Sequence, residues 1–336
     1  MTELSTEVTR AAVSEEEYPR GTRRAVRVAV RYAYLIALVI GILIGILPGG
    51  RLTEVAWILT GIIAFTIDRP WRDHLRVLVD WLPLVAVLLV YDLTRDLADT
   101  VGMPLRMHEL VTAERGLFGG ALPTVWLQQN LAGDGQPWWT PAIGVVYTTH
   151  FIVPWALAAI FYVYSRPLWA RYMRRILLLS YLALVTYILV PAAPPWYASR
   201  EGAIDEQVRR VSGFGLGMVS PDVSAKWLED QGNYVAALPS LHTAFAVLVT
   251  VTLWPVLTRW WLRVPLVLYP FAMAFTLVYG GEHYVIDVLL GYVYVGITVV
   301  LVRMWERYRA SGRRESPATD EREGATARES RVGADT

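Results

Sequence analysis

The sequence predicts an all-α fold, a polytopic membrane bundle of about eight transmembrane helices. Apolar residues make up 54% of the 336 residues, a larger share than ordinary soluble domains contain. They cluster into runs close to the roughly 20 residues that a helix needs to cross a bilayer. The net charge of +1 does not indicate a nucleic-acid partner. The chain has no cysteine, which excludes disulfides and thiolate metal sites.

Eight apolar segments have a length suited to spanning a membrane. They are 29–48, 52–67, 76–93, 142–165, 175–192, 239–258, 263–280 and 283–303. No small-residue cleavage signature follows the first segment at signal-peptide length, so we interpret it as an uncleaved span.

The arginines orient these spans. With eight spans, the arginine-rich connections all fall on one side of the membrane. They lie before the first span, between the second and third, between the fourth and fifth, between the sixth and seventh, and after the last. The positive-inside rule then places both termini in the cytoplasm of a multi-pass cell-membrane protein. The long segments 94–141 and 193–238 fall on the outer side. Segment 114–128 is too short and broken to span, and we expect it to lie along the outer interface.

Two short motifs carry the chemistry, LPSLHT at Leu238–Thr243 and YGGEHYVID at Tyr279–Asp287. Pro239 suits the first turn of a helix, and the two glycines of the second motif permit a sharp turn into the next helix. His242 and His283 are therefore expected at the outer ends of two neighbouring helices. Asp287 follows His283 by four residues, so the two should share one helical face.

This constellation suits phosphate-ester chemistry. His283 can attack phosphorus through one ring nitrogen while Asp287 holds the other N–H, and His242 can protonate the leaving oxygen. The Ser240 hydroxyl and the free N–H groups at both helix starts predict an anion cradle. A lone histidine in an apolar helix is more often a packing residue. An Asp inside a span, however, costs about 2.5–3.5 kcal/mol and is rarely without function.

The motif residues resemble those of a known family. PSLH at 239–242 and HYVIDV at 283–288 are similar to the second and third signature motifs of the type 2 phosphatidic acid phosphatase superfamily. The second motif, with Tyr292 after it, and PAAPPW at 191–196 resemble the branch that contains inositol phosphorylceramide synthases. The resemblance implies a six-helix catalytic core. It also implies a phosphohistidine at His283, supported by Asp287, with His242 as the proton donor.

The polar tails, the apolar spans and the resemblance, which covers about residues 90–305, together define the expected domains. They are a disordered cytoplasmic tail (1–22), N-terminal transmembrane helices (23–93), a phosphatase-like catalytic domain (94–305) and a second disordered cytoplasmic tail (306–336).

The sequence departs from the phosphatase pattern at the phosphate clamp. Thr276 and Leu277 stand where phosphatases usually have Ser-Arg, and the Arg166-Pro167 pair is cytoplasmic in the predicted topology. Both departures favour the synthase branch. Other residues must then contact the substrate. The candidates for substrate binding, besides Ser240, are Arg95, Arg200, Lys226, His150 and Tyr284. No cofactor or metal is implied.

Three functions remain open at this stage. The first is a lipid phosphotransferase that moves a phospho-headgroup to a lipid alcohol. The most specific version of this hypothesis is the transfer of inositol phosphate. The second is a lipid-phosphate phosphatase, with water as the acceptor for the same residues. The third is a transporter in which Asp80, Asp92, His150 and Asp287 relay ions. A serine protease using Ser240 is disfavoured, because the chain lacks a G-x-S-G motif. The partners implied are the membrane and its lipids; the sequence does not indicate an oligomeric state.

Overall fold

The structure is a computed structural model of the whole chain. The structure describes the backbone of residues 20–43, 51–98, 103–132, 137–212 and 234–315. Side chains are described over 24–41, 53–90, 103–132, 137–212 and 234–311. The chain divides into two compact units, Met1–Asp80 and Trp81–Thr336.

The first unit contains α2 (Arg20–Leu43), α3 (Arg51–Phe65) and the beginning of α4 (Trp71–Ala98). Arginine side chains of α2 hold the end of α3: Arg31 donates to the Phe65 carbonyl at 2.8 Å, and Arg27 pairs with Asp68 at 3.1 Å. Tyr34 donates to the Trp57 carbonyl at 3.0 Å. These contacts fix α2 and α3 as a packed helical pair.

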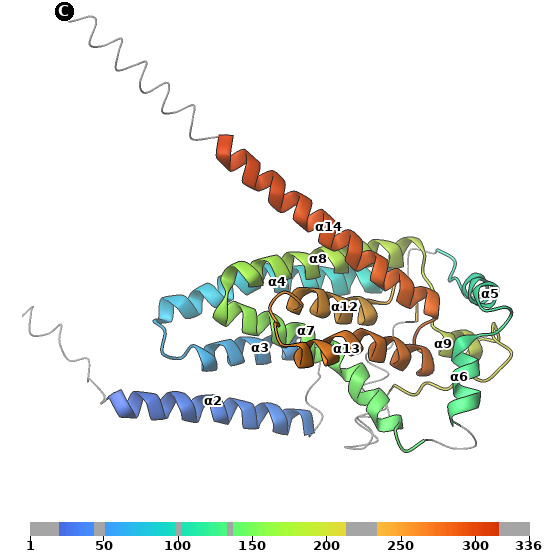
Figure 1. Cartoon of the computed structure of the whole chain (residues 1–336), viewed down its shortest axis with the longest axis horizontal. Coiled ribbons are helices and arrows are strands. Elements are labelled where there is room, and N and C mark those ends of the chain that lie inside the picture. The colour runs from blue at the N-terminus through green and yellow to red at the C-terminus, as the bar shows by residue number, and fades with distance from the viewer. Residues whose placement is uncertain (1–19, 44–50, 99–102, 133–136, 213–233, 316–336) are drawn as a thin grey trace, which may run out of the picture. The chain divides into compact units, whose positions relative to one another are not determined.

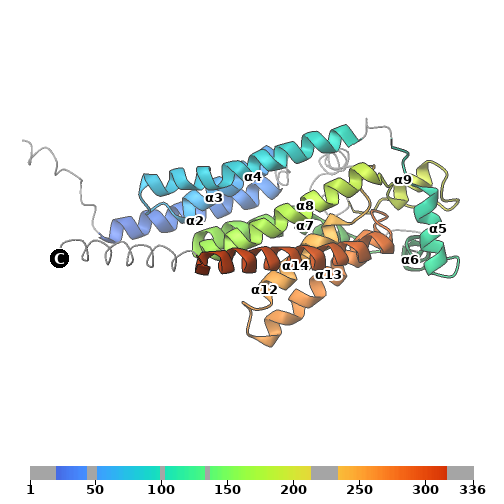
Figure 2. The ribbon, with the colours of Figure 1, turned by 90° about the horizontal axis from the view of Figure 1, so that it is seen from above.

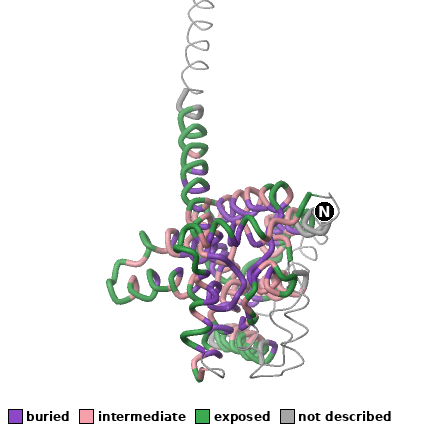
Figure 3. Tube along the Cα trace, turned by 90° about the vertical axis from the view of Figure 1, so that its right-hand side faces the viewer, coloured by how far each residue is buried: buried purple, intermediate pink, exposed green. Residues whose placement is uncertain are grey.

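The second unit is built around α12 (Leu241–Leu253). This helix packs against α7 (Thr140–Tyr164), α8 (Arg166–Leu189), α13 (Trp260–Tyr279) and α14 (Val285–Glu315), as Figure 1 shows. In Figure 3 the buried residues gather inside this bundle, while α14 is mostly exposed over residues 303–311. Because α12 carries the first histidine motif, the fold places that motif in the interior of the unit.

Three short helices cover one end of the bundle, where α14 begins (Figure 2). They are α5 (His108–Leu117), α6 (Pro123–Ala132) and α9 (Pro195–Arg200). An apolar cluster joins them to the start of α14, since Leu110, Val125, Ala198 and Tyr284 all belong to it. The expected interfacial segment 114–128 is thus divided between α5 and α6, and positive φ angles at Gly119 and Gly120 make the break.

A helix lies over each of the eight predicted spans, and the all-helical membrane fold is confirmed. Four helices in the described part of the chain are long and apolar enough to cross a membrane: α7, α8, α13 and α14 over Val285–Ser311. The predicted span 239–258 is shortened to α12, whose 13 residues extend about 20 Å. Helices usually end before a proline, and Pro255 follows this one. The count of eight spans stays a prediction.

Candidate active site

The second histidine motif forms a tight turn between α13 and α14. Gly281 adopts φ +76°, a conformation that glycine reaches without strain. A Cβ at this position would lie 2.9 Å from Val208. His283 stands in the turn itself, because α14 begins only at Val285. The expectation that His283 and Asp287 share a helical face is therefore wrong. The turn brings them together instead, with His283 Nδ1 3.5 Å from Asp287 Oδ2.

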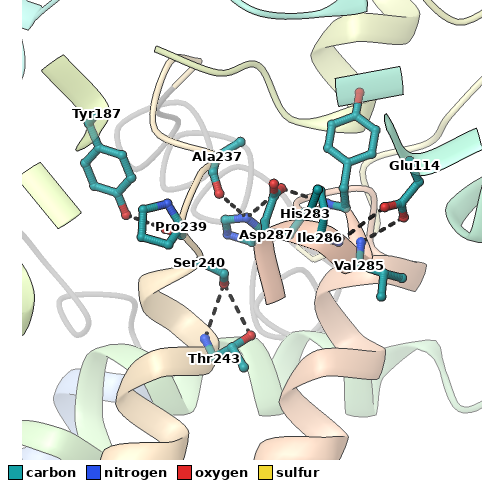
Figure 4. A network of polar contacts seen from close by, with 11 residues as sticks. Glu114, Tyr187, Ala237, Pro239, Ser240, Thr243, His283, Val285, Ile286 and Asp287 are labelled. Atoms are coloured by element: carbon teal, nitrogen blue, oxygen red, sulfur yellow. Dashed lines mark hydrogen bonds and ion pairs between the residues drawn. The ribbon is translucent and has the colours of Figure 1, made fainter. Parts of the chain in front are cut away.

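The ring of His283 is oriented mainly by a backbone carbonyl. Its Nδ1 lies 2.9 Å from the oxygen of Ala237 (Figure 4). A carbonyl oxygen only accepts hydrogen bonds, so Nδ1 carries a proton, and in the neutral ring Nε2 keeps its lone pair. The Asp287 carboxylate also accepts the N–H of Tyr284 at 2.9 Å. His283 is 4% exposed and Asp287 is fully buried, so both groups are held in one arrangement.

The Ala237 carbonyl is fixed by backbone pairing with another loop. The N–H of Ala237 donates to the Ala192 carbonyl at 3.0 Å, and the N–H of Ala192 donates to the Val235 carbonyl at 2.9 Å. Ala192 is also bridged to Arg106 on its other side. Three loop segments that are far apart in sequence thus position the acceptor for His283.

The first histidine motif begins α12. Its N-cap is Ser240, whose hydroxyl oxygen accepts the N–H of Thr243 at 3.3 Å. Pro239 precedes the helix, so its expected place in the first turn is wrong. The N–H of Ser240 donates to the Asp287 carbonyl at 3.0 Å, which joins the two motifs. Gly291 allows this approach, because a Cβ there would lie 2.7 Å from the backbone carbonyl oxygen of Ser240.

The His242 ring is packed among aromatic rings. It stacks on Tyr147 at 4.8 Å and lies edge-on to Phe151 at 5.8 Å, both on α7. The ring of His150, also on α7, is 4.0 Å away. His242 Nε2 is shielded from solvent and has no hydrogen-bond partner among the described residues. The His242 and His283 ring centroids are 5.5 Å apart, so the start of α12 and the turn before α14 bring the two rings close together.

A buried glutamate, which the sequence analysis did not single out, supports the start of α14. Glu114 of α5 is fully buried and accepts the N–H groups of Val285 at 2.8 Å and Ile286 at 3.2 Å (Figure 4). Burial raises the pKa of the Glu114 carboxyl, although these two hydrogen bonds oppose the rise. The expectation of a free anion cradle at this helix start is wrong, because a protein carboxylate already occupies the donors.

A second residue missed from the sequence is Arg210, which brings a guanidinium to the site. Its Nε donates to Glu282 at 2.7 Å, and it interacts with the hydroxyl of Tyr147. Ser212 also donates to Glu282. Arg210 and Glu282 are 72 residues apart in sequence, so no local pattern could have paired them. Arg210 thereby links the residue before His283 to the ring that stacks on His242.

The other candidate substrate contacts are placed as follows. Arg200 is exposed, pairs with Glu201 at 3.1 Å and lies over the Tyr197 ring at 4.5 Å. Tyr284 is 1% exposed, and its hydroxyl has no partner among the described residues. Lys226 and the side chain of Arg95 lie outside the described residues. The structure therefore brings His150, Ser240 and Tyr284 near the histidine pair and leaves Arg200 at the surface.

Comparison with known proteins gives a consistent result. Residues 108–301 match the model of the PAP2 superfamily. The chain is 27% identical over 245 residues to phosphoinositol dihydroceramide synthase of Bacteroides thetaiotaomicron, a match that covers 68% of this chain and 77% of that protein. No solved structure matches the chain. The matched range includes both histidine motifs and most of the helices that surround them. The chain therefore belongs to the PAP2 superfamily, and it is a membrane enzyme that transfers or hydrolyses lipid phosphate esters.

Proposed function

We propose that the protein transfers a phospho-headgroup, specifically inositol phosphate, from a donor phospholipid to a lipid alcohol through a phosphohistidine on His283. The observation that carries this proposal is the paired placement of the two rings, 5.5 Å apart. His283 has its Nδ1 bound to the Ala237 carbonyl, which leaves Nε2 as the nucleophile. The name of the Bacteroides relative, a phosphoinositol dihydroceramide synthase, supports the choice of headgroup and a lipid acceptor.

The reaction takes two balanced steps. First, His283 Nε2 forms a bond to phosphorus while the bond from phosphorus to the donor lipid's oxygen breaks, and His242 gives that oxygen its proton. Next, the acceptor hydroxyl attacks the same phosphorus, His242 takes up the hydroxyl proton, and the bond to His283 breaks. The enzyme returns to its starting state. The Asp287 carboxylate stabilises positive charge on the His283 ring in both steps.

Several features of the site support these roles. His242 Nε2 has no partner in the described part of the protein, so it is available to the leaving oxygen. His283 is buried and the Nε2 atom of His242 is shielded from solvent, and charged interactions are stronger where water is excluded. The predicted topology, with cytoplasmic termini, places this site at the outer side of the membrane.

The test is a transfer assay on purified protein with phosphatidylinositol labelled in its headgroup phosphate and a ceramide as acceptor. We expect the label to enter the acceptor lipid with wild type. His242→Ala should lower the rate by about 10² to 10⁴, the usual contribution of general acid–base catalysis, and His283→Ala should remove activity. His108→Ala is the matched control, because His108 is exposed on α5.

A phosphohistidine is acid-labile and alkali-stable, so denatured wild-type or His242→Ala protein should retain label with that signature. Label released into water would indicate the phosphatase alternative. An active His283→Ala variant, or transport of ions without any ester turnover, would contradict the proposal.

A further inference from the structure

A cleft of about 390 Å³ lies beside the active-site turn, formed by α9 and the loop that follows it. Its volume is within the range of roughly 300–1,000 Å³ that small-molecule sites occupy. The residues that matter for its chemistry are Trp196, Arg200, Asp205, Glu206, Gln207 and Arg210. None of these residues is assigned a role in the two-step reaction above.

The cleft is attached directly to the turn that carries His283. The N–H of Trp196 donates to the Gly281 carbonyl at 3.0 Å. Arg210, which lines the cleft, donates to Glu282 at 2.7 Å. Arg210 also interacts with Tyr147, on which His242 stacks. Residues of the cleft are therefore linked to the turn that carries His283 and, through Arg210 and Tyr147, to the ring of His242.

The charges of the lining balance. Arg200 and Arg210 contribute two positive charges, and Asp205 and Glu206 contribute two negative ones. Arg115 approaches Glu206 at 3.5 Å and Asp205 at 4.0 Å, and both carboxylates stay solvent-accessible. A lining of this kind offers both donors and acceptors, but it has no net charge to attract an ion.

The aromatic wall disfavours a cationic headgroup. Quaternary ammonium groups are bound over open aromatic faces. Here the guanidinium of Arg210 lies 4.8 Å from the Trp196 ring centroid, and that of Arg200 lies 5.6 Å away. A choline group would meet two positive charges at this wall. A neutral ring that carries several hydroxyl groups would instead find acceptors in the two carboxylates and donors in the guanidinium and amide groups.

We propose that this cleft binds the polyhydroxylated cyclitol ring of the donor lipid and so selects phosphatidylinositol among phospholipids. The inference rests on the proposed transfer function and adds the place where the headgroup is recognised. The ring hydroxyls bind to Asp205, Glu206 and Gln207, while Arg210 lies at the junction between the ring and the phosphate.

The test compares wild type with the double variant Asp205→Ala/Glu206→Ala. Two lost hydrogen bonds of ordinary strength should raise KM for phosphatidylinositol by about 5- to 150-fold, with kcat changed by less than about twofold. Free myo-inositol should inhibit the wild type competitively and the double variant much less. Glu109→Gln is the matched control: Glu109 lies on α5, outside the cleft, and its exposed carboxylate pairs with Arg106.

The outcomes distinguish a failure of the cleft inference from a failure of the proposed function. If wild type transfers from phosphatidylinositol and the double variant has the same KM, the cleft is not the headgroup site. The same conclusion follows if wild type uses phosphatidylcholine as well as phosphatidylinositol. If wild type transfers nothing from phosphatidylinositol, the proposed function fails, and the cleft inference fails with it. A melting temperature within a few degrees of wild type shows that the double variant is folded.

Discussion

The ring centroids of His242 and His283 lie 5.5 Å apart, but different kinds of contact orient the two rings. His283 is oriented by polar contacts, with the Ala237 carbonyl at 2.9 Å and the Asp287 carboxylate at 3.5 Å. His242 is oriented by ring packing against Tyr147, His150 and Phe151, and its Nε2 has no hydrogen-bond partner among the described residues.

This difference fits the different tasks that we propose for these two identical side chains. Hydrogen bonds at Nδ1 fix both the tautomer and the direction of His283, as a nucleophile requires. Aromatic packing fixes the plane of His242 but leaves the proton on its ring free to move. The predictions below remove these supports one at a time, beginning with the largest expected effect.

Asp287→Asn tests the polar support of His283. The Ala237 carbonyl keeps the proton on Nδ1, so the tautomer should survive, but the negative charge opposite the ring is lost. We expect kcat for headgroup transfer to fall by about 10²- to 10³-fold, as for the loss of one electrostatic contact in other enzymes. The half-exposed carboxylate of Asp73 supplies the control, Asp73→Asn. A variant with wild-type turnover would show that the carbonyl alone is sufficient.

Gly291→Ala tests the contact that keeps the two histidines together. The added methyl group would lie 2.7 Å from the backbone carbonyl oxygen of Ser240, so the start of α12 must move. Overpacking of this kind costs about 1–3 kcal/mol, and we expect a lower melting temperature in detergent with at least a tenfold slower transfer. Gly296→Ala is the matched control on the same helix, where nothing lies within 4 Å. Equal behaviour of the two variants would contradict this account of the helix contact.

Tyr147→Leu tests the aromatic support of His242. A stacked pair contributes about 0.5–1.5 kcal/mol, so the transfer rate should fall by about 2- to 12-fold. Tyr147→Phe keeps the ring and removes only the hydroxyl that interacts with Arg210. If the Phe variant is impaired as much as the Leu variant, the hydroxyl and not the stacking supports His242.

Glu114→Gln tests how the buried carboxyl that binds the start of α14, next to His283, makes protein stability depend on pH. Burial raises the pKa of Glu114 in the folded protein, so the folded state binds its proton more tightly than the unfolded state does. As pH rises from about 4.3, the unfolded value for glutamate, through the folded pKa, wild type should lose stability relative to the Gln variant. Melting temperatures of both proteins across this range measure the effect. A pH-independent difference would show that Glu114 has the same pKa in the folded and unfolded states.

Much of this architecture was predictable from sequence, and the exceptions have a common cause. Apolar runs of suitable length located a helix at each predicted span, and two short motifs identified the family. Arg210 and Glu114 were missed because their partners, Glu282 and Val285, lie 72 and 171 residues away. Glu114 also stands in a short helix with charged neighbours, where a glutamate usually faces solvent. The sequence analysis began the last helix at His283, but α14 begins two residues later, at Val285, after the turn that contains His283.

The acceptor that orients the His283 ring belongs to the main chain. Every amino acid at position 237 would supply the same carbonyl oxygen, so alanine-scanning mutagenesis would neither remove this contact nor measure its contribution. Its position depends on the pairing of the segments around residues 106, 192 and 236. Changes in any of these three loops could therefore alter the reactivity of a histidine that none of them contains.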